Sequence, residues 1–270
     1  MLPLAKLAAL LPLLASQCMA QSFTISNGQI FTPGFAIVNA PQPGTPLGGD
    51  DLHISLDVTA NGRLNLPPYV EDSPSQIRNI SVFLYSYTTG RNFTVAHPSQ
   101  GNDSAALGDI MAQEDGSTVK HINWKWPDCL IGDGQPRDLD SDRGIYNISI
   151  RQNFRLNDED HYTIFDLPIS VTNRIEDLGG DRPSCDELDN DMIALEDIDA
   201  ASANAVGVLF APGDSTQVEA VFPEDDPENG LGGSRREGTP ADGLGGAGSL
   251  DWRGAARWAC LAALAGALTL

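Results

Sequence analysis

Between residues 22 and 173, apolar and polar residues alternate at every second position. The alternation is clearest in the segments 52–58, 80–84, 146–150 and 163–171. A period of two places the apolar side chains on one face of a half-buried strand, and no segment before residue 173 shows a convincing helical period. The sequence therefore predicts an all-β domain of about seven antiparallel strands, arranged as a β-sandwich with an immunoglobulin- or fibronectin-like layout.

The first twenty residues have the features of a secretory signal peptide. Lys6 supplies a short basic start, residues 7–15 are apolar, and Ala20 ends the segment with the small residue that a cleavage site requires. Cleavage at this position would make Gln21 the first residue of the mature chain. We therefore expect residues 1–20 to be removed.

The other end of the chain has the pattern of a signal for attaching a glycosylphosphatidylinositol (GPI) anchor. The apolar tail 258–270 is thirteen residues long, whereas a membrane-spanning helix needs about 20. Small residues, a polar spacer and a short apolar tail together make up a GPI-attachment signal. We expect residues 249–270 to be removed and the anchor to be attached at Gly246, or at Ala247 or Gly248.

The composition divides the rest of the chain into two parts. Residues 21–200 contain the alternating strands and an acid-rich extension, and they are expected to form the β-sandwich domain. Glycine, proline and charged residues dominate 201–248, which predicts a largely disordered stalk between domain and anchor. The net charge of −21 disfavours nucleic acid as a partner, because phosphates repel an acidic protein. Membrane association is therefore expected to come from the lipid anchor.

The sequence has four cysteines, and two of them lie in the segments that are expected to be removed. Cys129 and Cys185 remain. The oxidising secretory route favours a disulfide between them, and their spacing is not that of a metal site.

Sequons for N-glycosylation occur at four asparagines, Asn79, Asn92, Asn102 and Asn147. In the predicted strands, Asn79 and Asn147 fall on the polar phase of the alternation. Glycans and core would then occupy opposite faces of these strands, which agrees with the predicted fold.

The segment 118–129 contains two tryptophans two positions apart, Trp124 and Trp126. On a strand they would share one face, with Asn123 and Lys125 on the other. Two flat aromatic faces could stack on sugar rings, or the pair could belong to the core of a sandwich. The core interpretation is favoured, because Asn123 and Lys125 are the natural solvent-facing neighbours.

No cofactor or metal is expected from the sequence. Asp138, Asp140 and Asp142 alternate as calcium ligands do, but the glycine and glutamate of an EF-hand loop are missing, so a solvated acidic loop is the simpler interpretation. The histidines lack the spacing of a metal site; they are His53, His97, His121 and His161. A nucleophile elbow is also missing, and we predict no catalytic residues.

Three stretches of the chain, SFTISNGQIFTPGFAIVNAPQPGTPLGGDDL, YSYTTGRNFTV and HINWKWPDCL, resemble uncharacterised secreted surface proteins of filamentous fungi. The resemblance covers residues 22–173 and implies a place at the cell wall or cell surface. Because no activity is assigned to that group, the resemblance implies no catalytic residues.

These features predict a GPI-anchored, N-glycosylated protein at the extracellular face of the plasma membrane or in the cell wall. Its expected role is structural or an interaction without catalysis, with cell-wall polysaccharide or other surface proteins as partners. Two alternatives stay open. One is a carbohydrate-binding module that uses the Trp124/Trp126 face, and the other is a secreted hydrolase with an unrecognised carboxylate pair.

Overall fold

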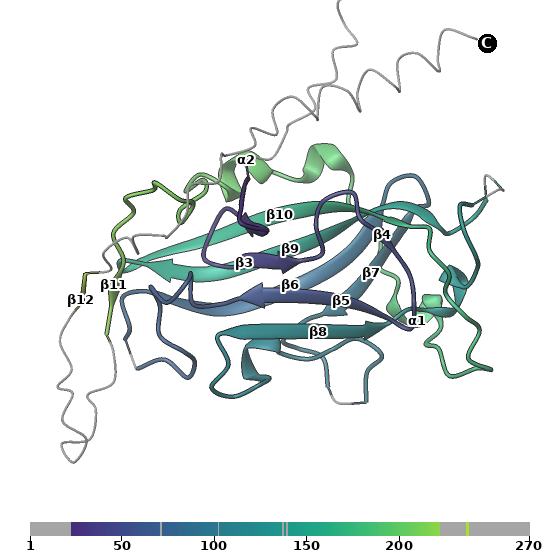
Figure 1. The fold of residues 1–270 in the computed structure, drawn as a ribbon, viewed down its shortest axis with the longest axis horizontal. Helices are drawn as coiled ribbons and strands as arrows, with labels where there is room; N and C mark the ends of the chain where they lie inside the picture. Colours follow the sequence, from purple (N-terminus) through teal and green to yellow (C-terminus); the bar gives the residue numbers. More distant parts are fainter. Residues whose placement is uncertain are drawn as a thin grey trace, which may run out of the picture. The chain divides into compact units, whose positions relative to one another are not determined.

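The computed structural model describes residues 23–70, 72–101, 103–136, 138, 140–221 and 236–237. The predicted signal peptide, the GPI signal with Gly246, Ala247 and Gly248, the sequon at Asn102 and most of the predicted stalk lie outside these residues. The described residues form two facing sheets with one core between them (Figure 1), which confirms the predicted all-β sandwich.

The first sheet has five strands in the order β1-β2-β3-β5-β8, each antiparallel to its neighbours. Its strands are β1 (Thr24–Ser26), β2 (Gln29–Phe31), β3 (Ile37–Ala40), β5 (Asp51–Asp57) and β8 (Val119–Lys125). β5 coincides closely with the alternating segment 52–58, and β8 lies within the tryptophan-containing segment 118–129. β1, β2 and β3 have only three or four residues each, too few for a period of two to be recognised.

The second sheet also has five strands, in the order β4-β10-β9-β6-β7. Its strands are β4 (Pro46–Leu47), β6 (Gln76–Ser86), β7 (Arg91–Ala96), β9 (Gly144–Leu156) and β10 (Glu159–Val171). The pairing is antiparallel except where the short β4 lies parallel to β10. β9 and β10 form a long hairpin whose turn residues, Asn157 and Asp158, have φ of 50° and 68°, the left-handed conformation that a tight hairpin turn requires.

The apolar faces of both sheets meet in a single core. The ring of Trp124 on β8 lies 6.3 Å from that of Phe93 on β7, and the ring of Phe35 lies 4.9 Å from that of Phe154 on β9. These aromatic contacts join one sheet to the other. Complete burial of a side chain the size of phenylalanine stabilises a fold by about 1.5–3 kcal/mol, so the aromatic residues contribute much of the stability.

The polar side chain of Gln152 lies inside this core and holds the connection between β2 and β3. Gln152 of β9 is 0% exposed. Its Oε1 accepts hydrogen bonds from the backbone N–H groups of Phe35 and Ala36, at 3.0 and 2.8 Å. Its Nε2 donates to Thr32 Oγ1 and to the carbonyl oxygen of Pro33, both at 3.1 Å. Four hydrogen bonds compensate for the burial of this amide.

Residues 185–221 form a segment, here called the strap, that contacts the second sheet at β7 and at β10. At β7, Asn190 Nδ2 donates to Thr94 Oγ1 at 2.9 Å. At β10, the Asn204 amide pairs with both backbone groups of Ile164, accepting from its N–H at 2.9 Å and donating to its carbonyl at 2.7 Å. Asn204 thereby supplies hydrogen-bond partners to the backbone of β10 on the edge that no described strand covers at this position.

The helices are all short. They are η2 (Ile110–Ala112), η3 (Asp128–Leu130), α1 (Cys185–Leu188), η4 (Leu195–Asp197) and α2 (Ala200–Ala203). The last three belong to the strap, and α2 lies beside β10 (Figure 1). Among the described residues, no helix is both long enough and apolar enough to cross a bilayer.

The domain extends beyond the boundary predicted at residue 200. Phe210 is 5% exposed, its ring stacks on that of Phe35 at 5.2 Å, and Val218 is 1% exposed. Further on, β11 (Glu219–Ala220) pairs with β12 (Arg236–Glu237). The predicted boundary is therefore too early, because the glycine- and proline-rich composition of 201–248 obscures two short apolar runs that pack on the core.

Candidate functional site

The tryptophan pair that was considered as an alternative sugar-stacking surface is buried. Trp124 and Trp126 are both 0% exposed, and their rings contact each other edge to face at 6.1 Å. The Trp126 ring also lies within reach of Gly48, to whose carbonyl its Nε1 donates at 3.4 Å. The carbohydrate-binding alternative based on this pair is therefore wrong, and the core interpretation is correct.

The weak calcium candidate is also not assembled. Asp138 and Asp140 are exposed, whereas Asp142 accepts a hydrogen bond from Arg91 Nε at 2.7 Å. Arg91 reaches Asp189 of the strap as well, with Nη1 to Oδ2 at 2.7 Å. Hydrogen bonds to these two carboxylates raise the pKa of the Arg91 guanidinium. Asp142 thus helps to fasten the strap to β7 and is not part of a calcium-binding loop.

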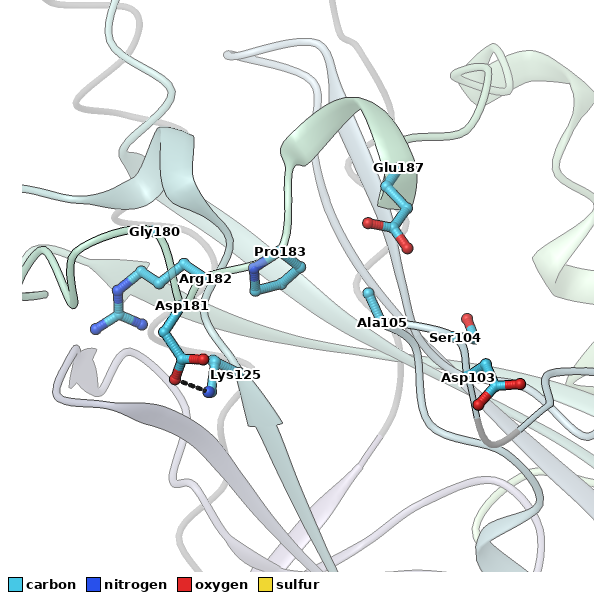
Figure 2. Close-up of a pocket in the computed structure, with 9 residues that line it drawn as sticks. All are labelled: Asp103, Ser104, Ala105, Lys125, Gly180, Asp181, Arg182, Pro183 and Glu187. Carbon is cyan, nitrogen blue, oxygen red and sulfur yellow. Dashed lines mark hydrogen bonds and ion pairs between the residues drawn. The ribbon is translucent and has the colours of Figure 1, made fainter.

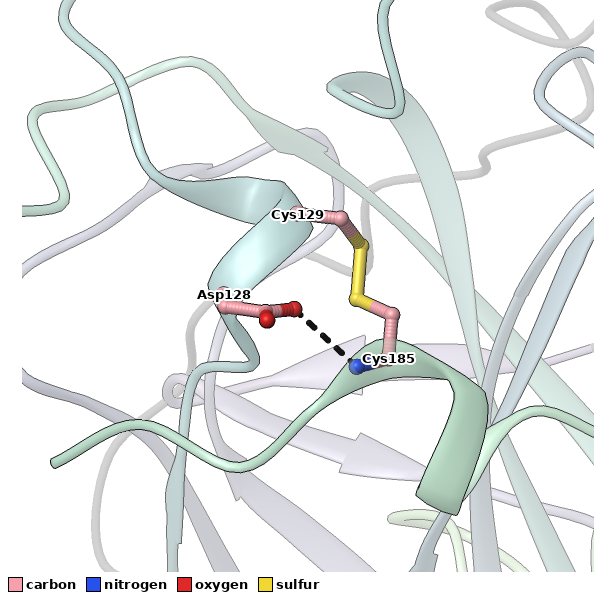
Figure 3. Close-up of side chains that lie close together, drawn as sticks. All are labelled: Asp128, Cys129 and Cys185. Carbon is pink, nitrogen blue, oxygen red and sulfur yellow. Dashed lines mark hydrogen bonds between the residues drawn. A yellow bond between two sulfur atoms is a disulfide. The ribbon is translucent and has the colours of Figure 1, made fainter. Parts of the chain in front are cut away.

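The predicted disulfide is present, between Cys129 in η3 and Cys185 at the start of the strap (Figure 3). The Asp128 carboxylate lies beside it and accepts a hydrogen bond from the backbone N–H of Cys185 at 3.0 Å. One carboxylate and two sulfur atoms this close are reminiscent of a metal site. Because the sulfur atoms are bonded to each other, they are not available as thiolate ligands.

The described sequons differ in accessibility. Asn79 and Asn147 are partly exposed on the outer face of the second sheet. Asn92 is 8% exposed, and its Nδ2 donates to the carbonyl oxygen of Asp191 in the strap at 3.1 Å. A glycan would have to leave from that same nitrogen atom, so the prediction for Asn92 conflicts with the folded structure. Ser149, in the sequon of Asn147, is only 1% exposed although it faces outward.

A shallow depression near the disulfide is lined mainly by charged loop residues (Figure 2). Lys125 and Asp181 form an ion pair of 2.6 Å there, which lowers the pKa of Asp181. Arg182 turns inward, where it donates to the carbonyl oxygens of Glu176 and Trp126 at 2.7 and 3.2 Å. The two exposed charges of Lys125 and Asp181 are thus paired with each other, and none of the described lining residues is aromatic.

A second hollow, of about 580 Å³, lies on the outer face of the second sheet and is here called the groove. β6, β9, β10 and the loop after β7 contribute its lining. The lining residues are Asn79, Ser81, Phe83, His97, Pro98, Ser99, Arg151, Asn153 and Tyr162. The pairing register of β9 with β6 and β10 brings these residues together. Ser81 lies opposite Arg151, and Asn153 lies between Asn79 on one side and Tyr162 on the other.

The chemistry of the groove combines aromatic faces with hydrogen-bonding groups. The Arg151 guanidinium lies over the Phe83 ring at 4.6 Å, a cation–π contact that holds both side chains. Arg151 Nε is buried and has no hydrogen-bond partner among the described residues. Tyr162 is 38% exposed, so one aromatic ring remains open to a ligand. The described lining contains no Asp or Glu, and hence no carboxylate pair of the kind used in glycoside hydrolysis.

The groove could not be identified from the sequence, although its residues leave a weak signal. Phe83 stands on the polar phase of β6 between Val82 and Leu84, and Tyr162 stands on the polar phase of β10. Large aromatic residues at outward strand positions can indicate a binding surface where the fold brings them together. The comparisons add no further information, since no family model, curated protein or solved structure matches the chain.

Proposed function

We propose that this protein is a GPI-anchored, N-glycosylated domain of the cell surface or cell wall, which acts by binding and not by catalysis. The groove on the second sheet is its proposed contact surface, and cell-wall polysaccharide is its proposed partner. The observation that carries the proposal is the composition of the groove, which joins an exposed tyrosine, a fixed arginine–phenylalanine pair and several amide and hydroxyl groups.

A polysaccharide suits this lining for chemical reasons. Sugar rings present hydroxyl groups at their edges and C–H groups on their faces. Asn153, Ser81 and Ser99 offer hydrogen bonds to the hydroxyl groups, and Tyr162 offers an apolar face with a polar tip. The volume of about 580 Å³ is within the range of ligand sites, roughly 300–1,000 Å³.

The sequon at the rim of the groove affects how the proposal must be tested. Asn79 is a lining residue, so a glycan on its side chain would lie against the groove. Binding should therefore be measured for the glycosylated protein and for an Asn79→Gln variant. If the protein's own glycan occupies the groove, the Asn79→Gln variant should bind the polysaccharide more strongly than the glycosylated protein does.

The binding test uses the full chain, released from the cells that secrete it, with soluble β-glucan, chitin oligosaccharides and mannan as probes. Tyr162→Ala should weaken binding to one of them by about tenfold, which corresponds to about 1.4 kcal/mol. The matched control is Tyr87→Ala, because Tyr87 is a tyrosine of similar exposure, 44%, outside the groove lining. Equal losses in the two variants, or no binding by either glycosylated or Asn79→Gln protein, would contradict the proposal.

The proposed anchor is tested separately. A chain that ends after Ser249 lacks the apolar tail and should appear in the medium, whereas the full-length protein should stay on the cell until a phosphatidylinositol-specific phospholipase C is added. Retention of the truncated chain on the membrane would refute the anchor without affecting the groove.

A further inference from the structure

Two histidines that are far apart in the sequence lie side by side on the outer face of the first sheet. His53 is on β5 and His121 is on β8. His53 pairs with Asn123, so His121 is its diagonal neighbour across the two strands. The imidazole rings are stacked, with centroids 5.6 Å apart and planes inclined by 18°.

Both rings are held by an oxygen atom at Nδ1. His53 Nδ1 lies 2.7 Å from Asn123 Oδ1, and His121 Nδ1 lies 3.1 Å from both carboxylate oxygens of Glu114. A carbonyl or carboxylate oxygen only accepts, so each Nδ1 carries the hydrogen atom. The lone pair of each ring is therefore on Nε2.

This is the arrangement that metal-binding histidines need. A histidine that ligates a metal through one nitrogen almost always donates its other N–H to a carboxylate, a carbonyl or water, which fixes the tautomer and the ring orientation. Here Glu114 and Asn123 supply that support to two neighbouring rings. Neither histidine lines the groove or the depression near the disulfide.

We propose that His53 and His121 bind a divalent transition-metal ion through their Nε2 atoms, with water molecules at the remaining positions. Imidazole nitrogen suits copper, zinc and nickel, and Cu²⁺ should bind more tightly than Zn²⁺. Bonds of about 2.0–2.1 Å require the two Nε2 atoms to converge on one ion. The ring planes are nearly parallel, so both must tilt for the two lone pairs to meet one ion. Both side chains are at the surface, with the His121 side chain 41% exposed, so each ring has room to tilt about its Nδ1 hydrogen bond.

The site is independent of the proposed polysaccharide groove, because it lies on the other sheet. It was not apparent from the sequence, since the two histidines are 68 residues apart and belong to different strands. Only the β5–β8 register brings them together.

The test is titration of the full-length glycosylated protein with CuCl₂, followed by calorimetry and electron paramagnetic resonance. We expect one tightly bound Cu²⁺ whose spectrum shows coupling to two imidazole nitrogens. His53→Ala and His121→Ala should each weaken this site by about tenfold or more, and Glu114→Gln by about tenfold. His161→Ala is the matched control, since His161 is a partly exposed histidine that lines neither hollow and contacts Phe154 rather than another histidine in the described structure.

Two kinds of result would contradict the proposed copper site. Copper binding that is unchanged in His53→Ala and His121→Ala, or that is lost equally in His161→Ala, would overturn the proposal and assign the copper to the acidic surface. Failure of the wild-type protein to bind Cu²⁺ below millimolar concentration would also overturn it. Each variant changes a side chain at the surface, so a melting curve in the absence of metal confirms that the fold is retained.

Discussion

Replacing the buried Gln152 by leucine tests how the two sheets are joined. Leucine has a similar size but no hydrogen-bonding groups, so the Phe35 and Ala36 N–H groups would lose their acceptor at 3.0 and 2.8 Å. The carbonyl oxygen of Pro33 would keep the Thr163 hydroxyl at 2.9 Å. Two buried donors would thus be left unsatisfied.

The two unsatisfied donors determine the expected loss in the free energy of unfolding. A buried polar group left without a partner costs about 1–3 kcal/mol, so Gln152→Leu should lower the free energy of unfolding by about 2–6 kcal/mol. Thr163→Val is the matched comparison, because Pro33 retains the Gln152 amide as a donor at 3.1 Å. This variant should lose only about 1 kcal/mol.

Urea denaturation, followed by the fluorescence of the buried Trp124 and Trp126, measures both losses on one scale. The burial of these rings should make their emission sensitive to the opening of the sandwich. A loss below about 1 kcal/mol for Gln152→Leu, or a larger loss for Thr163→Val than for Gln152→Leu, would refute the assignment of Gln152 as the link between the sheets.

Three further predictions concern the covalent bond, the tyrosines and the glycans. Replacing Cys129 and Cys185 by alanine should lower the free energy of unfolding by about 4 kcal/mol, because the bond joins residues with a sequence separation of 56; a urea midpoint that does not move would contradict this. Burial raises the pKa of Tyr69 to about 12 and also raises that of Tyr146. Folded pKa values above the unfolded value of about 10 mean that this stabilisation is complete below pH 10 and is lost as the pH rises further, by about 1.4 kcal/mol per pH unit for each tyrosine; unfolding measured from pH 9 to 12 should show the decline, and a flat profile would argue against it. Peptide mapping of the secreted protein should find no glycan at Asn92, and a fully occupied Asn92 would show that the strap docks differently.

The sequence predicts those parts of the fold whose burial is periodic. β5, β6, β9 and β10 each bury every second residue over much of their length, so alternation reveals them. Gln152 interrupts the apolar phase of β9, and its burial depends on a loop more than one hundred residues earlier. No local pattern in the sequence records such a partner.

The candidate sites are harder to predict, because each is made by register between distant strands. Phe83 and Arg151 meet through the pairing of β6 with β9, and His53 and His121 meet through the pairing of β5 with β8. Trp124 and Trp126 differ from these sites, because they are near neighbours in the sequence. Two aromatic residues on one strand face suggested either a platform or a core, and the burial of both rings, with Trp124 against Phe93 of the opposite sheet, decides for the core.

The disulfide also determines how the domain would respond to mechanical tension applied from beyond residue 221. Such a pull would load the contacts of the strap one after another: first the packing of Val218 and Phe210 on the core, then the hydrogen bonds of Asn204 with β10, and last those of Asp189 with β7. Peeling would end at Cys185, where the covalent bond transfers the load to Cys129. The released segment 186–221 would lengthen the chain by about 120 Å at about 3.3–3.6 Å per residue, while both sheets stayed closed.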